Sequence, residues 1–124
     1  LSVISTFIEE ARVEISKLGN FRINCFGHLG DGNLHFNIFP NKGEKREDYN
    51  HIRPEIKKTI HELVHLHGGS VSAEHGIGRL KINDLVKYSD PVKLKLNKSI
   101  KSVMDPKGIL NPGVIFAPTH KTKK

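Results

Sequence analysis

Residues 21–40 read FRINCFGHLGDGNLHFNIFP and contain two runs in which apolar and polar side chains alternate, over residues 21–26 and 34–39. Alternation with a period of two is typical of β-strands. The Asp31-Gly32 pair between the two runs is a strong signal for a tight hairpin turn. The stretch therefore predicts an antiparallel hairpin in which Asp31 and Gly32 form a two-residue turn.

This turn predicts that His28 pairs directly with His35, with their Cβ atoms about 4.5–5.5 Å apart on one face of the sheet. A slip of one residue would turn both histidines into the core, so the register is strongly specified. The predicted core face comprises Phe21, Ile23, Cys25, Gly27, Leu29, Leu34, Phe36 and Ile38. The opposite, mostly polar face comprises Arg22, Asn24, Phe26, His28, His35, Asn37 and Phe39.

Helices are predicted on both sides of the hairpin, because apolar residues there recur at steps of three and four. The order helix, hairpin, helix, loop, helices indicates an α+β fold with helices on one face of a small antiparallel sheet. The predicted helices are residues 1–18, a segment from 50–53 to 67, residues 79–86, and a segment capped by Asp90 that starts at Pro91. Two further short strands are predicted at 70–72 and 114–116.

The composition limits the class of protein. The 124 residues suffice for one domain at most, and the chain opens inside a helical pattern without Met, so we expect further sequence upstream. The single cysteine, Cys25, excludes an internal disulfide framework and is assigned to the core face as a small hydrophobe. No apolar run is long enough for a transmembrane helix. The net charge is +7, but the sequence contains no stripe in which Arg alternates with aromatic residues, which argues against nucleic-acid binding. The positive charge also suits a small anionic substrate.

Three residues form a candidate metal site. His28 and His35 come from the hairpin, and Glu74 stands beside His75 in a loop with glycines at 76 and 78. Two histidines and one carboxylate are a ligand set that leaves open positions, as catalytic metal sites do. The alternative is a solvated polar face. His61 and His65, four residues apart on a helix, are interpreted as a solvated helix face.

Three motifs carry a family resemblance: GHLGDGNLH at 27–35, SAEHGIG at 72–78 and DPKGILNPG at 105–113. In this order they resemble the C-terminal substrate domain of FAD-linked oxidases and dehydrogenases, a group that includes D-lactate dehydrogenase, the glycolate oxidase D subunit and D-2-hydroxyglutarate dehydrogenase. The resemblance implies a ferredoxin-like α+β domain that caps a flavin held by an N-terminal domain, which this chain lacks. Residues 1–117 would then be the C-terminal part of the cap, and residues 118–124 a disordered basic tail.

The resemblance also implies roles for individual residues. It assigns His28, His35 and Glu74 to a divalent metal, either zinc, manganese or iron. It further assigns His75 as the catalytic base, Asn37 as a substrate contact and Asn111 as a contact near the flavin. The implied reaction oxidises a D-2-hydroxy acid to a 2-oxo acid with hydride transfer to FAD, and the fragment alone is expected to be inactive.

Several alternatives stay open at the level of sequence. The chain could be a stand-alone metal-binding or interaction module without redox activity, or part of a flavoenzyme of the same superfamily with another substrate. The electron acceptor could be a quinone, a cytochrome or an electron-transfer flavoprotein, and a homodimer is compatible with the sequence. The expected location is the cytoplasm, with peripheral contact to the inner membrane through the electron acceptor as an alternative.

Overall fold

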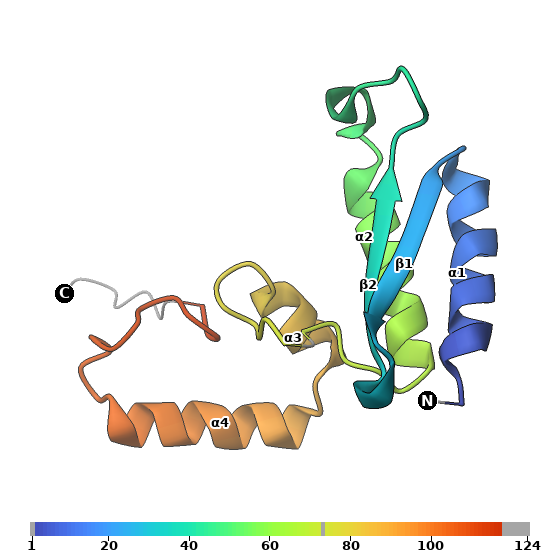
Figure 1. Cartoon of the computed structure of the whole chain (residues 1–124). Helices are drawn as coiled ribbons and strands as arrows, with labels where there is room; N and C mark the ends of the chain where they lie inside the picture. Colours follow the sequence, from blue (N-terminus) through green and yellow to red (C-terminus); the bar gives the residue numbers. More distant parts are fainter. Residues whose placement is uncertain (1, 73, 118–124) are drawn as a thin grey trace. The chain divides into compact units, whose positions relative to one another are not determined.

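The computed structural model describes residues 2–72 and 74–117 (Figure 1). The chain divides into two compact units, Leu1–Val71 and Ser72–Lys124. The fold is α+β, as predicted. The tail prediction for residues 118–124 lies outside the described residues. The first unit contains helix α1 (Ile4–Leu18), strand β1 (Arg22–His28), the 3-10 turn η1 (Leu29–Asp31), strand β2 (Asn33–Phe39), the 3-10 turn η2 (Arg46–Tyr49) and helix α2 (Arg53–Leu66). The second unit contains helices α3 (Ile82–Tyr88) and α4 (Pro91–Met104).

The core of the first unit lies along one face of α1. Phe7, Ala11 and Ile15 are buried, and their spacing of four residues places them on one side of the helix. The Phe7 ring meets the edge of the Phe36 ring on β2, with centroids 6.1 Å apart and an interplanar angle of 75°. This contact joins α1 to the apolar face of the hairpin, as the alternation predicted.

Helix α2 packs beside α1 near the hairpin (Figure 1). At its C-terminal end, His67 Nε2 lies 2.8 Å from Glu10 Oε2 of α1. The His67 ring also meets the Phe7 ring edge-on, at a centroid distance of 5.9 Å. His67 therefore links the two helices by a polar contact and an apolar one.

The predicted two-residue turn is wrong. In the structure His28 pairs with Asn33 and His35 pairs with Phe26. The connection is longer because Leu29–Asp31 forms the 3-10 turn η1, which Gly32 closes by donating its N–H to the Leu29 carbonyl at 3.1 Å. Gly32 adopts the left-handed conformation that also suits a two-residue turn, so the sequence signal was the same for both. The pairing moves by two residues, so the residues that stay in the strands keep their predicted faces. The prediction for Leu29 is wrong, because this residue lies in η1 instead of a strand and is exposed, not part of the core face.

Three further predictions also need correction. Residues 70–72 and 114–116 are not strands. A strand needs a partner for its backbone groups, and the described sheet contains only β1 and β2. The predicted helix at 79–86 begins three residues later, as α3, after a turn closed by the Lys81 N–H and the Ile77 carbonyl at 3.2 Å.

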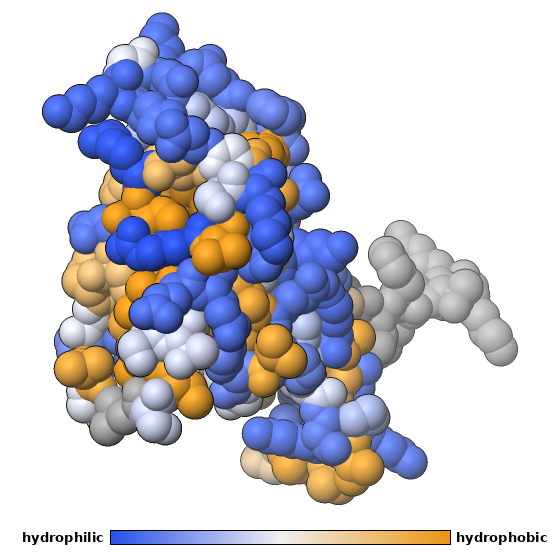
Figure 2. All heavy atoms as spheres, turned by 90° about the vertical axis from the view of Figure 1, so that its right-hand side faces the viewer, coloured by the Kyte–Doolittle hydropathy of each residue, from blue (hydrophilic) through white to orange (hydrophobic). Residues whose placement is uncertain are grey.

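The second unit leaves much of its apolar surface exposed. Its helix α4 starts as predicted, with the Asp90 carboxylate accepting the Lys93 N–H at 2.8 Å. Apolar side chains reach the surface in both units, and Figure 2 shows some of them among polar neighbours. The exposed apolar residues of α4 are Val92, Leu96, Ile100, Val103 and Met104.

In the part of the chain that the structure describes, no helix has the length and apolar character to cross a membrane.

Candidate metal and substrate site

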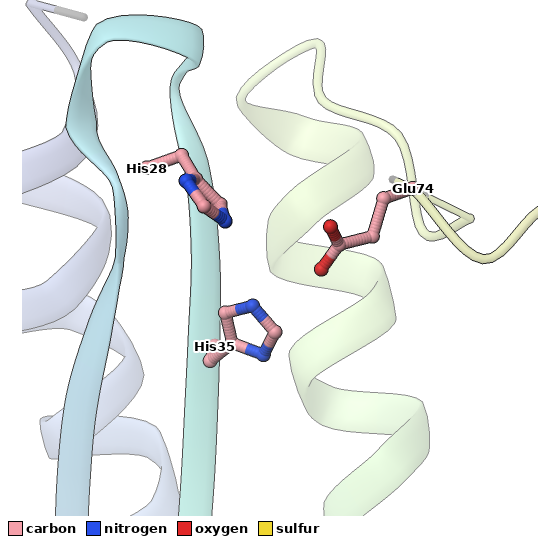
Figure 3. A group of neighbouring side chains, drawn as sticks. All are labelled: His28, His35 and Glu74. Carbon is pink, nitrogen blue, oxygen red and sulfur yellow. The ribbon is translucent and has the colours of Figure 1, made fainter.

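His28 and His35 are neighbouring side chains on the polar face of the hairpin (Figure 3). Because His35 pairs with Phe26, His28 is its diagonal neighbour rather than its direct partner. The ring centroids are 6.3 Å apart at an interplanar angle of 60°, and one nitrogen of each ring lies within 4.8 Å of the other. The structure thus brings the two predicted ligands together despite the wrong turn.

The spacing of these nitrogens suits a shared metal ion. A tetrahedral ion with metal–nitrogen bonds of about 2.1 Å holds two imidazole nitrogens about 3.4 Å apart. The His28 side chain is exposed, so a small rotation can reach that distance, whereas His35 is half-buried. The two imidazoles can therefore fit a divalent ion, with the half-buried His35 ring held in place and the exposed His28 ring able to rotate.

Two neighbours hold the pair in place. The Phe26 ring stacks on the His35 imidazole at a centroid distance of 5.0 Å and an interplanar angle of 6°. Gly27 brings the two strands close together beside His28, since a Cβ atom at this position would lie 2.1 Å from the Asn33 carbonyl oxygen. Only glycine allows this approach.

Asn37 lies two residues beyond His35 on β2, half-buried, and lines a groove of about 920 Å³ within the first unit. Ligand pockets usually fall in the range of about 300–1,000 Å³. The groove has apolar walls and three cations in its lining, Arg46, Arg53 and Lys57. Sequence reasoning missed these cations, although Arg53 and Lys57 stand one helical turn apart. The other lining residues are Phe21, Phe36, Ile38, Phe39, Pro40, Tyr49, Asn50, Pro54, Ile56, Ile60 and His61.

Glu74 and His75 belong to the second unit. The Gly76 N–H donates to the Ser72 carbonyl at 3.0 Å and closes a turn around the two residues. Both side chains are exposed, His75 by 80% and Glu74 by 43%, and His75 Nε2 lies 3.9 Å from Glu74 Oε1. This separation is an ion-pair distance rather than a hydrogen bond, so the His75 ring has room to meet a ligand.

Asn111 also lies in the second unit, in an exposed turn. It has a left-handed backbone, with φ at 45°, and its carbonyl accepts the Val114 N–H at 3.2 Å. Arg79 Nη2 donates to the Pro112 carbonyl at 3.1 Å, and the Ile115 N–H donates to the Gly78 carbonyl at 2.8 Å. The turn that carries Asn111 is thus tied to the residues that follow the His75 loop.

Cys25 is half-buried, on the apolar face of β1 opposite Phe36. Burial raises the pKa of its thiol above the ordinary value, and the nearby Arg12 only partly opposes this effect. A raised pKa keeps the sulfur protonated near neutral pH. The structure agrees with the interpretation of Cys25 as a small apolar side chain.

Sequence comparisons show the family of the chain. The family model described as FAD linked oxidases, C-terminal domain, matches residues 1–115. The chain belongs to this family. The match covers all three of the motifs at 27–35, 72–78 and 105–113.

Relatives of this FAD-linked oxidase domain carry names of 2-hydroxy acid dehydrogenases. D-2-hydroxyglutarate dehydrogenase of Stutzerimonas stutzeri is 42% identical over 99 residues, which are 79% of this chain and 21% of the relative. The mitochondrial D-2-hydroxyglutarate dehydrogenase of Arabidopsis thaliana is 39% identical over 110 residues, 88% of this chain and 18% of the relative. D-lactate dehydrogenase of Anaerostipes hadrus is 38% identical over 96 residues, 77% of this chain and 20% of the relative. The chain therefore spans about a fifth of the length of these relatives.

Proposed function

We propose that this chain is the substrate- and metal-binding part of an FAD-dependent dehydrogenase that oxidises a D-2-hydroxy acid to the 2-oxo acid. The observation that carries the proposal is the His28–His35 pair, whose nitrogens lie close enough for one ion, in a chain of the FAD-linked oxidase family. The names of the relatives support the substrate class, D-2-hydroxyglutarate or D-lactate.

In this proposal His28, His35 and Glu74 hold a divalent metal. Two imidazoles and one carboxylate are a donor group that could hold one ion, and the same group suits zinc, manganese or iron. The chemistry that a bound ion supplies is a lower pKa for the substrate hydroxyl. Phe26 contributes by holding the plane of the His35 ring, and Gly27 by keeping the strands close.

His75 is the general base of the proposed reaction. One of its ring nitrogens takes the proton of the substrate hydroxyl, while the hydrogen on the substrate's C2 leaves with two electrons. The chemistry that a bound flavin supplies is acceptance of that hydride. The products balance as a 2-oxo acid, a protonated His75 and a two-electron-reduced cofactor.

Asn37 and Asn111 are proposed to orient the reactants. The half-buried Asn37 carboxamide offers N–H donors to the substrate carboxylate, and the Arg46, Arg53 and Lys57 side chains around the neighbouring groove favour an anion. Asn111 presents a carboxamide on an exposed left-handed turn, which suits a hydrogen bond to the edge of a flavin ring. We expect most of the flavin site to lie outside this chain.

Metal binding is the first test, because the 124-residue chain contains the whole proposed ligand set. We expect one zinc or manganese ion per chain by mass spectrometry and calorimetry, and loss of that ion in His28→Ala/His35→Ala. The matched control is His61→Ala/His65→Ala, which also removes two imidazoles and should retain the ion. Equal metal binding by the two double variants would contradict the ligand assignment.

The reaction is tested in the flavoprotein that contains this chain. Anaerobic D-2-hydroxyglutarate or D-lactate should bleach the flavin absorbance, and His75→Ala should slow this step by about 10²- to 10⁴-fold while flavin and metal stay bound. His51→Ala, which removes an exposed imidazole elsewhere, is the control. If the chain binds metal but the flavoprotein oxidises no 2-hydroxy acid, the result would instead support the alternative of a metal-binding module without redox activity.

A further inference from the structure

Asp105 stands out in the second unit, because it is the one buried residue among the unit's described residues. A buried carboxylate is costly unless it is paired and hydrogen-bonded. Asp105 follows the last residue of α4, at the start of the motif that ends in Asn111-Pro112-Gly113. Its two carboxylate oxygens therefore require hydrogen-bond donors.

Three donors satisfy the Asp105 carboxylate. Oδ1 accepts the Ile109 N–H at 3.0 Å, and Oδ2 accepts the Leu110 N–H at 3.0 Å and the Lys101 ammonium at 2.6 Å. Lys101 also donates to the Leu110 carbonyl at 2.7 Å, and the Gly108 N–H donates to the Asp105 carbonyl at 3.0 Å. The side chains of Asp105 and Lys101 thus fix both backbone groups of Leu110, the residue before Asn111.

The other side of the same turn is also fixed. As described above, Arg79 binds the Pro112 carbonyl, and the Gly78 carbonyl binds the Ile115 N–H. Gly78 and Arg79 follow His75 by three and four residues. The Asn111 turn is therefore held from α4 at one end and from the His75 loop at the other.

We propose that Asp105, with Lys101, is the positioning residue for the Asn111-Pro112-Gly113 turn and keeps this turn attached to the loop that carries His75. The proposal rests on the proposed function, in which His75 and Asn111 face the reacting groups. Asp105 acts through the backbone of residues 109–110 and does not itself touch substrate or flavin. Among the described residues of the second unit no apolar side chain is buried, so within the unit the turn is held by these hydrogen bonds and the Lys101–Asp105 ion pair.

The first experiment measures amide hydrogen exchange in the 124-residue chain. In Asp105→Asn the single amide oxygen can replace Oδ2, which accepts the Leu110 N–H and Lys101, or Oδ1, which accepts the Ile109 N–H, and the NH₂ group then faces the remaining donor or donors. We expect the Ile109 and Leu110 amides to exchange at least about tenfold faster. Asp90→Asn is the matched control, since Asn also caps helices, and should leave both amides unchanged. Unchanged exchange in Asp105→Asn would overturn the proposal.

The second experiment measures turnover and the flavin spectrum in the flavoprotein that contains the chain. A misplaced turn should lower kcat by about 10- to 100-fold in Asp105→Asn, leave KM within about twofold and shift the flavin absorbance band. Lys101→Met leaves the Asp105 carboxylate free to accept both the Ile109 and Leu110 N–H groups, so kcat should fall less than in Asp105→Asn. This variant provides the test if Asp105→Asn does not fold. Turnover and spectrum equal to those of Asp90→Asn would refute the positioning role. A wild-type flavoprotein that oxidises no 2-hydroxy acid would refute the proposed function, while the exchange experiment still decides whether Asp105 orders the turn.

Discussion

Gly27→Ala should damage the hairpin at the point where it carries the histidine pair. A Cβ atom at Gly27 would lie 2.1 Å from the Asn33 carbonyl oxygen and 3.0 Å from Leu34 Cα, whereas ordinary contacts begin near 3.4 Å. The strands must therefore separate by more than 1 Å beside the His28–Asn33 pair. Overpacking of this kind costs about 1–3 kcal/mol of stability. The displacement also moves His28 away from His35, so metal affinity should fall by about 10- to 100-fold, as for lost supporting contacts in other metal sites.

The same hairpin offers a control for this prediction. A Cβ atom at Gly30 would meet nothing within 4 Å, so Gly30→Ala should change the free energy of unfolding by less than about 0.5 kcal/mol. Both quantities are measurable on the chain, by urea unfolding followed by circular dichroism and by calorimetric titration with zinc. If Gly27→Ala binds zinc and unfolds like Gly30→Ala, then the close approach of the strands at Gly27 does not hold the histidine pair.

Three further predictions concern the interior and the titrating groups. Ile15→Ala should lower the free energy of unfolding by about 2–5 kcal/mol, because Ile15 is 1% exposed, whereas Val13→Ala, at a 55% exposed position of the same helix, should cost less than about 0.5 kcal/mol in the same denaturant titration. Burial raises the pKa of the Cys25 thiol above its ordinary 9.0, so the rate of its alkylation by iodoacetamide should reach half its maximum above pH 9.0. A midpoint at or below pH 9.0 would count against the burial of this thiol. The Lys101 hydrogen bond, helped by the Leu110 and Ile109 N–H groups, holds the pKa of Asp105 below its ordinary 3.8, against the opposing effect of burial. The carboxylate therefore stabilises the fold above pH 3.8 and loses this contribution as the pH falls toward its folded pKa, so the acid limb of the thermal midpoint should be shallower in Asp105→Asn than in the wild type.

The hairpin shows which part of the structure was predictable from sequence. The alternation at 21–26 and 34–39 predicted the strands and the side of the sheet for each residue. It could not predict the turn length, because Gly32 adopts a left-handed conformation in both a two-residue and a four-residue connection. The two registers differ by two residues, an even number, so His28 and His35 share a face in either one. The prediction that the two histidines share a face therefore required only that the register shift be an even number of residues, and not that the turn length be correct.

The second unit was less predictable for a physical reason. Residues 114–116 have the composition of a strand, yet Ile115 adopts a left-handed backbone with φ at 67° and its N–H bonds to Gly78. β-propensity expresses packing against neighbouring strands, and the unit's described residues supply none. By contrast, the start of α4 depends on a local signal, the Asp90 cap followed by Pro91, and was predicted correctly. Asp105 gave a weaker signal, because only Lys101 stands at the one-turn spacing of a helix, while the Ile109 and Leu110 N–H groups reach the carboxylate only through the turn that follows α4.

The contacts that hold the histidine pair and the contacts that hold the Asn111 turn lie in separate units. The histidine pair depends on the Phe26 stack, the Gly27 approach and the Phe7–Phe36 contact, all within the first unit. The Asn111 turn depends on Asp105, Lys101 and Arg79, all within the second. Mutations in separate networks should have additive effects on stability, to within about 0.5 kcal/mol. A large coupling between Gly27→Ala and Asp105→Asn in turnover of the flavoprotein, without coupling in stability, would therefore report that both elements act on the same reacting groups.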